Sequence, residues 1–378
     1  PVRPPSEGQS RSLLIRATRN CPWNRCQFCN IYKGQRFWYR GVDEIKGDVD
    51  VAGAIADEVK RASWGLGYGG VVSDEVVSTV VRSNPEIYGI GSAEPDVLSA
   101  RLHSLVNVSQ WLASGGETAF LQDANTLIMR TPELIEVIRH LKETLPTLDR
   151  VTSYGRSKTA AKKSLDELKE LHSVGLSRLH MGLESGCNEV LEYMQKGVTA
   201  EEHIEGGRKV VESGISLSEY VMPGLGGREW SEKHILETAR VLNQVEPDYI
   251  RIRSLVIPQN APLCERVESG EFQTLADDEI VDEVRLLIEN LNCKSYVVSD
   301  HITNLLDIEG QLPGDKGEML EIIDRYRAMS PMEKLRFGLQ MRLHCYLGMH
   351  GVLGGAMRES VQEALESIEA EAPDARAK

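Results

Sequence analysis

Three cysteines within a nine-residue segment constrain this chain more than any other feature of its sequence. The segment reads Cys21-Pro22-Trp23-Asn24-Arg25-Cys26-Gln27-Phe28-Cys29, a C-x4-C-x2-C spacing, and it holds three of the seven cysteines. Thiolates this close together usually share one soft metal centre. A structural zinc site needs a fourth protein ligand, yet no Cys or His lies within ten residues on either side of the segment.

Three thiolates would leave one iron of a [4Fe–4S] cube open to an outside ligand, which suits catalysis better than a structural role. A short β-prone run over residues 12–18 leads into the cysteines. They are therefore expected at the C-terminal end of a first strand, where βα-barrels place their chemistry. A structural zinc ion and a set of packed free cysteines are the alternatives. The strand-end position and the open ligation favour a catalytic cluster held by Cys21, Cys26 and Cys29.

Strand-like and helix-like segments alternate along the chain. The expected strands cover residues 12–18, 118–124, 150–154, 178–184, 215–222 and 249–256. Helix-start patterns lie between them: Thr131 is the expected N-cap before Pro132, and Ser164 and Thr199 each open a capping box. Six β/α units in sequence predict a parallel sheet with helices outside it. The expected fold class is α/β, a partial (β/α)6 TIM-like barrel with a mostly helical C-terminal extension.

The domain organisation follows from where this alternation holds. We expect a flexible lead-in over 1–11, the partial barrel over 12–262, the C-terminal extension over 263–366 and a frayed tail over 367–378. Residues 64–110 form a glycine-punctuated insertion in the barrel, which is too long for a simple connection. This insertion is either a lid or partner surface, or a packed helical insertion.

Charge and cysteine usage limit the partners and the compartment. The net charge of −14 argues against nucleic acid as a partner, because phosphate binding needs a basic face; a local basic patch is still compatible with it. No apolar run approaches the roughly 18 residues of a membrane span, and residues 1–10 lack the apolar core of a signal peptide. An odd, low cysteine count predicts a reducing, cytoplasmic setting.

With these features the chain resembles the radical SAM superfamily, over about residues 12–260. That superfamily usually carries C-x3-C-x2-C after the first barrel strand, with an aromatic residue before the last cysteine. Phe28 fills the aromatic position, and the extra residue between Cys21 and Cys26 is a departure. The segment 181–191, followed by Lys196-Gly197, is most similar to the subgroup of oxygen-independent coproporphyrinogen oxidases, elongator-type enzymes and methylthiotransferases.

The resemblance implies an oxygen-sensitive enzyme with a [4Fe–4S] cluster and S-adenosylmethionine (SAM) as cofactors. It implies reductive cleavage of SAM to a 5′-deoxyadenosyl radical, which abstracts hydrogen from a substrate, and an electron donor such as flavodoxin or ferredoxin. The acidic charge favours a small-molecule substrate. Transfer of another SAM fragment at the same cluster, or a non-enzymatic iron–sulfur or zinc module, are the alternatives. Substrate and net reaction do not follow from the resemblance.

The resemblance also implies a set of SAM contacts. Glu184 takes the position of a polar residue that binds the ribose hydroxyls, and Lys196 that of a basic residue that pairs with the SAM carboxylate, replaced or assisted by Arg156. The glycine-rich turn 222–227 would let the backbone approach adenine. Ile257 would pack on adenine or in the core. The remaining cofactor candidates at strand ends are Ser153, Ser218 and Tyr220.

The segment Gly115-Gly116-Glu117 matches the motif that grips the SAM amino group in the superfamily, but here it precedes its strand. Glu117 is therefore expected in a turn at the wrong end of the barrel. Gln122 and Asp123 lie at the proper end of the strand. The Asp123 carboxylate, or carbonyl groups beside it, would accept hydrogen bonds from the SAM ammonium, unless Asp123 is only a turn or N-cap residue.

Two residues are candidates for contact with the substrate. Tyr154 lies at the end of the third strand and faces the substrate on this interpretation. His301 follows a short strand in the extension, where it would handle a proton or simply be a capping or internally bonded histidine. The other cysteines lack short spacings, so no second cluster is expected; they are Cys187, Cys264, Cys293 and Cys345.

Overall fold

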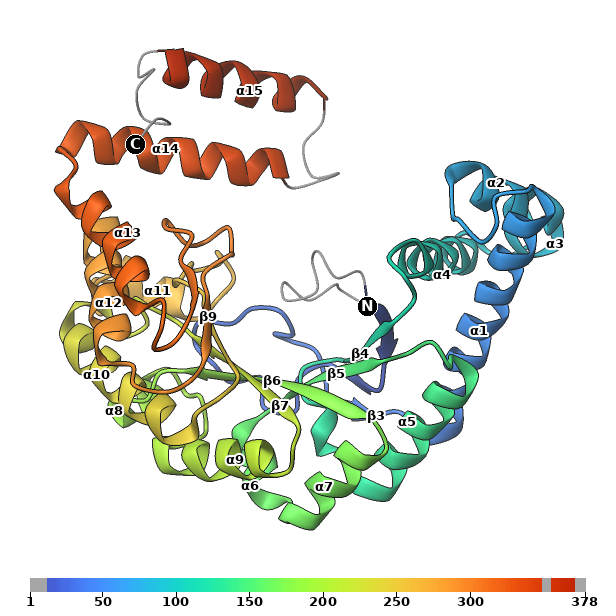
Figure 1. The fold of residues 1–378 in the computed structure, drawn as a ribbon, viewed down its shortest axis with the longest axis horizontal. Helices are drawn as coiled ribbons and strands as arrows, with labels where there is room; N and C mark the ends of the chain where they lie inside the picture. The colour runs from blue at the N-terminus through green and yellow to red at the C-terminus, as the bar shows by residue number, and fades with distance from the viewer. Residues whose placement is uncertain (1–11, 349–354, 371–378) are drawn as a thin grey trace. The chain divides into compact units, whose positions relative to one another are not determined.

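The computed structural model describes residues 12–348 and 355–370 and has an α/β fold (Figure 1). Its mostly parallel main sheet has the strand order β1-β4-β5-β6-β7-β8-β9-β10, and a second sheet pairs β2 with β3. The strands are β1 (Leu13–Arg16), β2 (Thr18–Arg19), β3 (Trp38–Tyr39), β4 (Thr118–Gln122), β5 (Arg150–Gly155), β6 (Leu176–Glu184), β7 (Ser216–Val221), β8 (Tyr249–Ile252), β9 (Tyr296–Val298) and β10 (Glu309–Gln311). The α/β fold class predicted from the alternation is confirmed.

Helices follow nearly every strand. They are α1 (Val42–Gly65), α2 (Asp74–Ser83), α3 (Pro85–Tyr88), α4 (Pro95–Ala113), α5 (Thr131–Thr144), α6 (Ser157–Lys162), α7 (Leu165–Ser173), α8 (Asn188–Tyr193), α9 (Ala200–Glu212), α10 (Gly227–Val245), α11 (Leu263–Glu268), α12 (Asp277–Asn290), α13 (Lys316–Ala328), α14 (Pro331–Gly348) and α15 (Gly355–Ala370). A short 3-10 helix covers Thr126–Ile128.

The chain divides into two compact units. Unit 1 comprises residues 1–182 and 195–219, and unit 2 comprises residues 183–194 and 220–378. In unit 1, β1 pairs in parallel with β4, β4 with β5, and β5 with β6. Leu13, Phe120 and Val151 are fully buried in this part of the sheet, and α1 packs against both α4 and α5. The cysteine loop begins just beyond β1 and β2.

Unit 2 contains the other strand ends and the C-terminal helices. Here β8 pairs in parallel with β9, and β10 pairs antiparallel with β9. Helix α12 packs against α10 and α13, and α14 lies beside α15 (Figure 1). The segment predicted as a mostly helical extension is therefore mostly helical, with the antiparallel strand β10 as an addition that the sequence did not indicate.

Local sequence patterns account for most element ends. The predicted capping boxes at Ser164 and Thr199 are confirmed, with Glu167 and Glu202 completing them. The N-cap assignment of Thr131 is wrong: Arg130 is the N-cap, and the Thr131 hydroxyl donates instead to Glu167 at 2.6 Å. The insertion 64–110 consists of the end of α1, then α2, α3 and most of α4. The expectations for residues 1–11 and 371–378 lie outside the described residues.

Candidate functional site

The cysteine loop is a compact turn closed by one asparagine. Cys21, Cys26 and Cys29 are free, half-buried thiols. The Asn24 backbone N–H donates to the Cys21 sulfur at 3.3 Å, and its side-chain amide donates to the Tyr32 carbonyl at 2.5 Å. The Cys29 N–H donates to the Cys26 carbonyl at 3.4 Å. These contacts shape the loop without using any of the three sulfurs in a disulfide.

Two cations lie beside these thiols. Burial raises the pKa of Cys26, and the charges of Lys196 and Arg156 act in the opposite direction. Burial likewise raises the pKa of Cys29, opposed by a backbone hydrogen bond and by Lys196. The cations favour the thiolate forms that metal ligation requires. Three free thiols next to two cations therefore fit three-thiolate ligation of an anionic iron–sulfur cluster.

Among residues 12–348 and 355–370, no three His, Cys, Asp or Glu side chains converge on one metal-ion position. Cys187, Cys264 and Cys293 are free thiols outside the loop. Near the C-terminus, the His344 ring bonds the Gln340 carbonyl at 2.9 Å, and the Cys345 side chain and His350 lie outside the described residues.

Trp23 fastens the loop to the segment that carries Lys196. Its indole N–H donates to the Gln195 carbonyl at 2.6 Å. Its ring lies 5.1 Å from the Arg25 guanidinium and 5.0 Å from that of Arg156. The ring also fills the space beside Gly197, where an added Cβ would come within 2.1 Å of it. Trp23 is thus held by a hydrogen bond, two cation–π contacts and a close backbone approach.

The structure brings the predicted residues Arg156 and Lys196 together. The Arg156 guanidinium donates to the Lys196 carbonyl at 2.6 Å, and the Arg156 backbone N–H donates to the Asn125 side chain at 3.0 Å. The Lys196 ammonium lies 5.6 Å from the centre of the Phe28 ring. Burial lowers the pKa of Arg156, opposed by the nearby cysteines. Both cations predicted for the SAM carboxylate therefore adjoin the cysteine loop.

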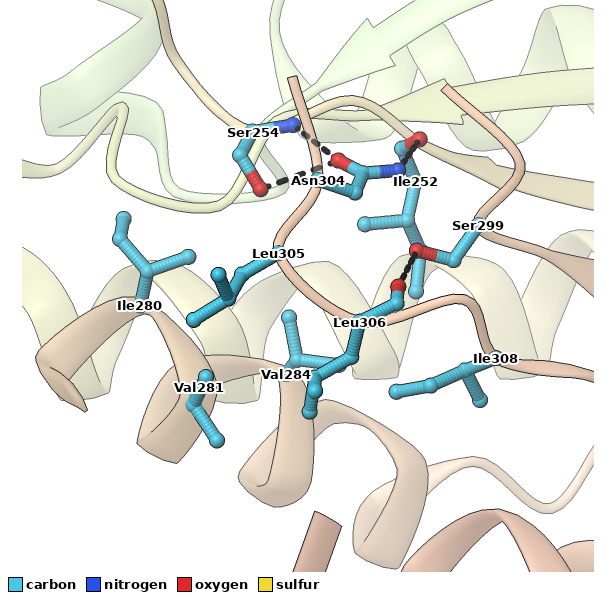
Figure 2. A pocket seen from close by; sticks show the side chains of 10 residues that line it. All are labelled: Ile252, Ser254, Ile280, Val281, Val284, Ser299, Asn304, Leu305, Leu306 and Ile308. Atoms are coloured by element: carbon cyan, nitrogen blue, oxygen red, sulfur yellow. Dashed lines mark hydrogen bonds between the residues drawn. The ribbon is translucent and has the colours of Figure 1, made fainter. Parts of the chain in front are cut away.

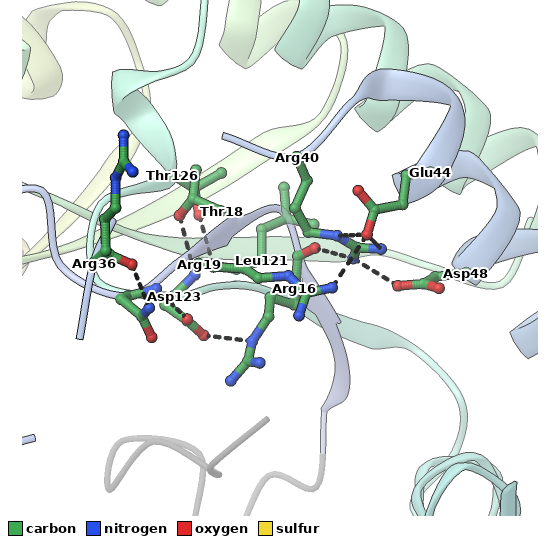
Figure 3. A network of polar contacts seen from close by, with 11 residues as sticks. Arg16, Thr18, Arg19, Arg36, Arg40, Glu44, Asp48, Leu121, Asp123 and Thr126 are labelled. Atoms are coloured by element: carbon green, nitrogen blue, oxygen red, sulfur yellow. Dashed lines mark hydrogen bonds and ion pairs between the residues drawn. The ribbon is translucent and has the colours of Figure 1, made fainter. Parts of the chain in front are cut away.

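Asp123 is already bonded on both carboxylate oxygens (Figure 3). One oxygen accepts from the Arg16 guanidinium at 3.0 Å and the other from the Asn20 backbone N–H at 2.7 Å, and the side chain is buried. Asn20 immediately precedes the first cysteine. Asp123 therefore ties the end of β4 to the start of the cysteine loop, a turn-anchoring role that was one of its two predicted roles.

The other candidates in unit 1 point to different environments. Gln122 is buried, and the Ser153 hydroxyl donates to the Leu121 carbonyl at 3.0 Å. Tyr154 lies edge-on to Phe120, with ring centres 5.0 Å apart. Ser218 is fully buried, and its hydroxyl has no hydrogen-bond partner in the part of the chain that the structure describes. Ser218 is therefore a buried polar group with hydrogen-bonding capacity left over.

The alternation predicted along β7 is visible in its buried polar residues. The Glu219 carboxyl group and the His203 ring form a hydrogen bond of 3.0 Å, and both side chains are buried. His203 belongs to α9, so Glu219 faces that helix. By the period of two, Ser218 and Tyr220 share the opposite face. This is the pair that the sequence proposed for cofactor contact.

In unit 2, two turns after strands are joined through a buried histidine. Glu184 ends β6 in a left-handed conformation, with φ of 62°, and its carbonyl accepts from the Met222 N–H at 3.1 Å. His234 bonds the Ser185 hydroxyl at 2.8 Å and the Met222 carbonyl at 3.1 Å. Burial lowers its pKa to about 4. A neutral His234 therefore links the turn after β6 to the turn 222–227.

A buried carboxyl group holds the same glycine-rich turn from α12. Glu283 accepts from the Gly224 N–H and from the Ser231 hydroxyl, both at 2.6 Å. Burial raises the pKa of Glu283 to about 7. Gly224 is close enough to Ile280 that an added Cβ would lie 2.7 Å from it. The turn predicted to approach adenine is thus fixed by two buried titratable groups.

His301, the candidate in the extension, is bonded to a near neighbour in sequence. The His301 ring bonds the Thr303 hydroxyl at 2.8 Å, and burial together with Arg253 lowers its pKa to about 4. Asn304 accepts from the Ser254 N–H at 2.9 Å and donates to the Ile252 carbonyl at 2.8 Å, above a small, mostly apolar cavity (Figure 2). His301 therefore fits the prediction of an internally bonded histidine better than the prediction of a residue that handles a proton.

Tyr220 and Ile257, the two remaining cofactor candidates, lie in different surroundings. Tyr220 lies under the Arg253 guanidinium, 5.5 Å from ring centre to cation. The sixth strand was expected to reach residue 256, but β8 ends at Ile252, and Ile257 lies in the loop beyond it. The chain leaves the sheet early there because Ser254 bonds to Asn304 instead of continuing the ladder.

Glu117 lies where its register predicted. It directly precedes β4, and its carbonyl accepts from the N–H groups of Asp149 and Arg150. Gly115 and Gly116 before it both have positive φ. The Gly-Gly-Glu segment is thus the turn between α4 and β4, at the end of the strand opposite to Gln122.

Sequence reasoning missed three residues that organise these turns: Trp23, His234 and Glu283. Trp23 could have been noticed from the sequence. It lies between Cys21 and Cys26, where the loop has one residue more than usual, and such a large aromatic side chain must pack against something. His234 and Glu283 occupy ordinary positions on amphipathic helices, and their partners are distant in sequence, so no local pattern identified them.

A family model decides what kind of domain this is. The model of the radical SAM superfamily matches residues 88–240. Residues 88–240 belong to a radical SAM domain. Members of the superfamily bind a [4Fe–4S] cluster and SAM. The match begins after the cysteine loop, so the loop is assigned here from its own residues.

Relatives extend the comparison. A tRNA uridine(34) acetyltransferase of Methanocaldococcus jannaschii is 24% identical over 31% of this chain and 22% of its own length. A probable threonylcarbamoyladenosine tRNA methylthiotransferase of the same organism is 25% identical over 47% of this chain and 43% of its own. The chain therefore spans less than half the length of either. The predicted resemblance to elongator-type enzymes and methylthiotransferases is confirmed.

Among solved structures, Elp3 of Methanocaldococcus infernus is 17% identical, with a TM-score of 0.43, over 61% of this chain and 57% of its own. None of the helices within the described residues has the length and apolar character needed to cross a membrane.

Proposed function

We propose that this radical SAM enzyme holds a [4Fe–4S] cluster on Cys21, Cys26 and Cys29 and cleaves SAM reductively at that cluster. The observation that carries the proposal is the set of three free thiols on one loop after β1, beside Lys196 and Arg156. When bound, the cluster and SAM supply a 5′-deoxyadenosyl radical that abstracts hydrogen from the substrate.

The protein's own groups bind and orient. Lys196 and Arg156 provide positive charge for the SAM carboxylate, since a guanidinium and an ammonium are the usual partners of that group. Glu184 offers acceptors for the ribose hydroxyls, and the turn 222–227 offers backbone groups for adenine. Trp23 fixes the loop against Gln195 and so sets the distance between the cysteines and Lys196.

The test is anaerobic reconstitution of the wild type and of single Cys→Ser variants, with iron and sulfide measured before any assay. Cys26→Ser should lose most of the iron, whereas Cys264→Ser, a half-buried thiol on α11, should keep it. With dithionite and SAM the wild type should release 5′-deoxyadenosine. Release of methylthioadenosine alone would favour fragment transfer, and binding of one zinc without iron would overturn the enzyme proposal.

The substrate is proposed to be a small molecule, because the chain carries a net charge of −14. A nucleic-acid substrate is the second candidate, since two relatives are named for tRNA modification. The two are distinguished by adding bulk tRNA or a small-metabolite extract to the SAM cleavage assay. Stimulation by tRNA that ribonuclease abolishes would replace the small-molecule proposal.

A further inference from the structure

The segment that contains the cysteine loop has an unusual charge for this chain. Residues 12–40 hold six cations and no Asp or Glu, although the whole chain has a net charge of −14. The cations are Arg16, Arg19, Arg25, Lys33, Arg36 and Arg40. A local positive region in an acidic protein is a place where a negatively charged partner can approach.

Acidic residues from elsewhere neutralise only part of this segment. Arg16 pairs with Asp123, and Arg19 pairs with Glu44. Arg40 is buried and pairs with Glu44 and Asp48. These three cations are therefore structural. They join the start of α1 and the end of β4 to the strands that flank the cysteine loop.

Two arginines are left for an outside partner. Arg25 and Arg36 are exposed, and neither forms an ion pair with any residue that the structure describes. Arg25 lies inside the cysteine loop, directly before Cys26. The Arg36 carbonyl accepts from the Asn20 side chain at 2.7 Å, while its guanidinium points away from the network (Figure 3).

Large apolar side chains are exposed between and beside these arginines. The exposed fractions are 62% for Ile31, 52% for Trp38 and 56% for Tyr39. Trp38 and Tyr39 form β3, which pairs with Arg19 and Thr18 of β2. This pairing ties the two aromatic side chains to backbone only a few residues before Cys21. Trp, Tyr and Arg are the residue types that most often dominate binding energy at protein interfaces.

We infer that the loop face, defined as Arg25, Ile31, Arg36, Trp38 and Tyr39, docks a small acidic one-electron carrier protein. The inference rests on the proposed function, because the carrier gives up one electron and the cluster on the neighbouring cysteines gains it. The rest of this acidic chain repels such a carrier, so a basic face beside the cluster selects where it lands. Electron-transfer encounters use small interfaces, so a few exposed side chains can be enough to dock the carrier.

Arginines beside exposed aromatic side chains would also suit the phosphates and bases of RNA. The position of the loop face therefore decides between a carrier protein and an RNA. The loop face lies on the segment that bears the cysteines themselves, and every turnover needs an electron there whatever the substrate is. An RNA that served as substrate would instead need to reach the reacting carbon of SAM. The carrier is therefore the occupant that these observations favour.

The experiment compares two reductants on the reconstituted holoenzyme. Reduced flavodoxin and dithionite each reduce the cluster of the wild type, of an Arg36→Glu/Trp38→Ala variant, and of Arg82→Glu, an exposed arginine on α2. Stopped-flow absorbance gives the rates. The double variant should reduce at least tenfold more slowly with flavodoxin at low salt and equally fast with dithionite. The wild-type flavodoxin rate should fall steeply with salt, and that of the double variant should not.

Three outcomes would overturn the inference. Equal flavodoxin rates in all proteins would show that the carrier docks elsewhere. Equal losses with dithionite and flavodoxin would show that the residues support the cluster instead of a partner. Loss of RNA binding with unchanged flavodoxin rates would identify RNA as the occupant. Failure of the wild type to form a cluster, in contrast, would contradict the proposed function and is seen before any carrier is added.

Discussion

The cysteine loop 21–29 and the glycine-rich turn 222–227 both follow strands and both are proposed to contact SAM, yet they are held by different means. The loop is closed by near neighbours, such as Asn24 and Tyr32, and fastened at one aromatic point, Trp23 on Gly197. The turn has a similar contact, between Gly227 and the Phe272 ring, but buried titratable side chains also hold its backbone. It is held by His234 from α10 and Glu283 from α12, two buried titratable side chains.

The two turns should therefore fail in different ways. Aromatic packing against a glycine depends on shape and hardly on pH, so the addition of a single carbon atom at that glycine should disturb the loop. Hydrogen bonds accepted by a buried carboxyl group depend on its protonation, so the turn should be sensitive to pH and tolerant of isosteric change. Each of the following changes addresses one side of this contrast.

The largest effect on SAM binding is expected for Gly197→Ala. Gly197 has φ of +70°, which an L-residue adopts at a cost of roughly 1–2 kcal/mol, and its new Cβ would lie 2.1 Å from the Trp23 ring. The ring must leave its site, and Lys196 moves with the backbone. Since 1.4 kcal/mol is a factor of about ten, SAM affinity measured by equilibrium dialysis should fall at least about tenfold, with less iron retained.

Gly67→Ala is the matched control for this change. Gly67 has φ of +83°, but nothing lies within 4 Å of the added Cβ. The control carries the backbone strain without the clash and should bind SAM like the wild type. Equal losses in both variants would mean that strain alone matters, and that the contact between Trp23 and Gly197 does not hold the loop.

Two substitutions separate the contribution of the Trp23 ring from that of its hydrogen bond. Trp23→Phe keeps a ring beside Arg25 and Arg156 but loses the donor to Gln195, so SAM binding should weaken by about 0.5–1.5 kcal/mol. Trp23→Ala loses both and should weaken it further. Equilibrium dialysis measures the affinity, and absorbance follows cluster loss in air. A Trp23→Ala protein as stable to air as the wild type would contradict this role.

The glycine-rich turn is tested by pH. Burial raises the pKa of Glu283 from 4.5 to about 7, so the folded protein binds the proton more tightly than the unfolded chain. The stability contributed by this group is fully present below about pH 4.5 and falls as pH rises to about 7. The loss amounts to about 3 kcal/mol. Glu283→Gln keeps an acceptor for Gly224 and has no charge to bury.

Unfolding in urea should therefore give similar midpoints for Glu283→Gln and wild type at pH 5, and a higher midpoint for the variant at pH 8. Glu321→Gln, an exposed position on α13, should follow the wild type at both values. A variant that is less stable than wild type at pH 8 would show that the carboxylate holds the turn better than the amide, and would reverse the assigned direction.

Much of this organisation could be predicted from residue patterns that act over short distances. The capping boxes at Ser164 and Thr199 and the strand before the cysteines depend on neighbours in sequence, and they were found. Arg156 and Lys196, the cations proposed for the SAM carboxylate, came only from a family resemblance. The end of β8 at Ile252 depends on Asn304, and the shape of the turn depends on Glu283, which is 59 residues from Gly224. Such contacts between distant parts of the chain leave no local pattern.

The smallest effect is expected for Glu117→Ala, and it tests the register on which both regions were interpreted. Glu117 is exposed at the start of β4, and only its backbone carbonyl is used there. SAM cleavage should stay within about twofold and stability within about 0.5 kcal/mol of wild type. Asp123→Ala, at the other end of the same strand, removes the acceptor for Arg16 and Asn20 and should disturb the cysteine loop. Complete loss of SAM binding in Glu117→Ala alone would mean that the Gly-Gly-Glu turn reaches the cofactor after all, and that the amino group of SAM is gripped from the amino-terminal end of β4.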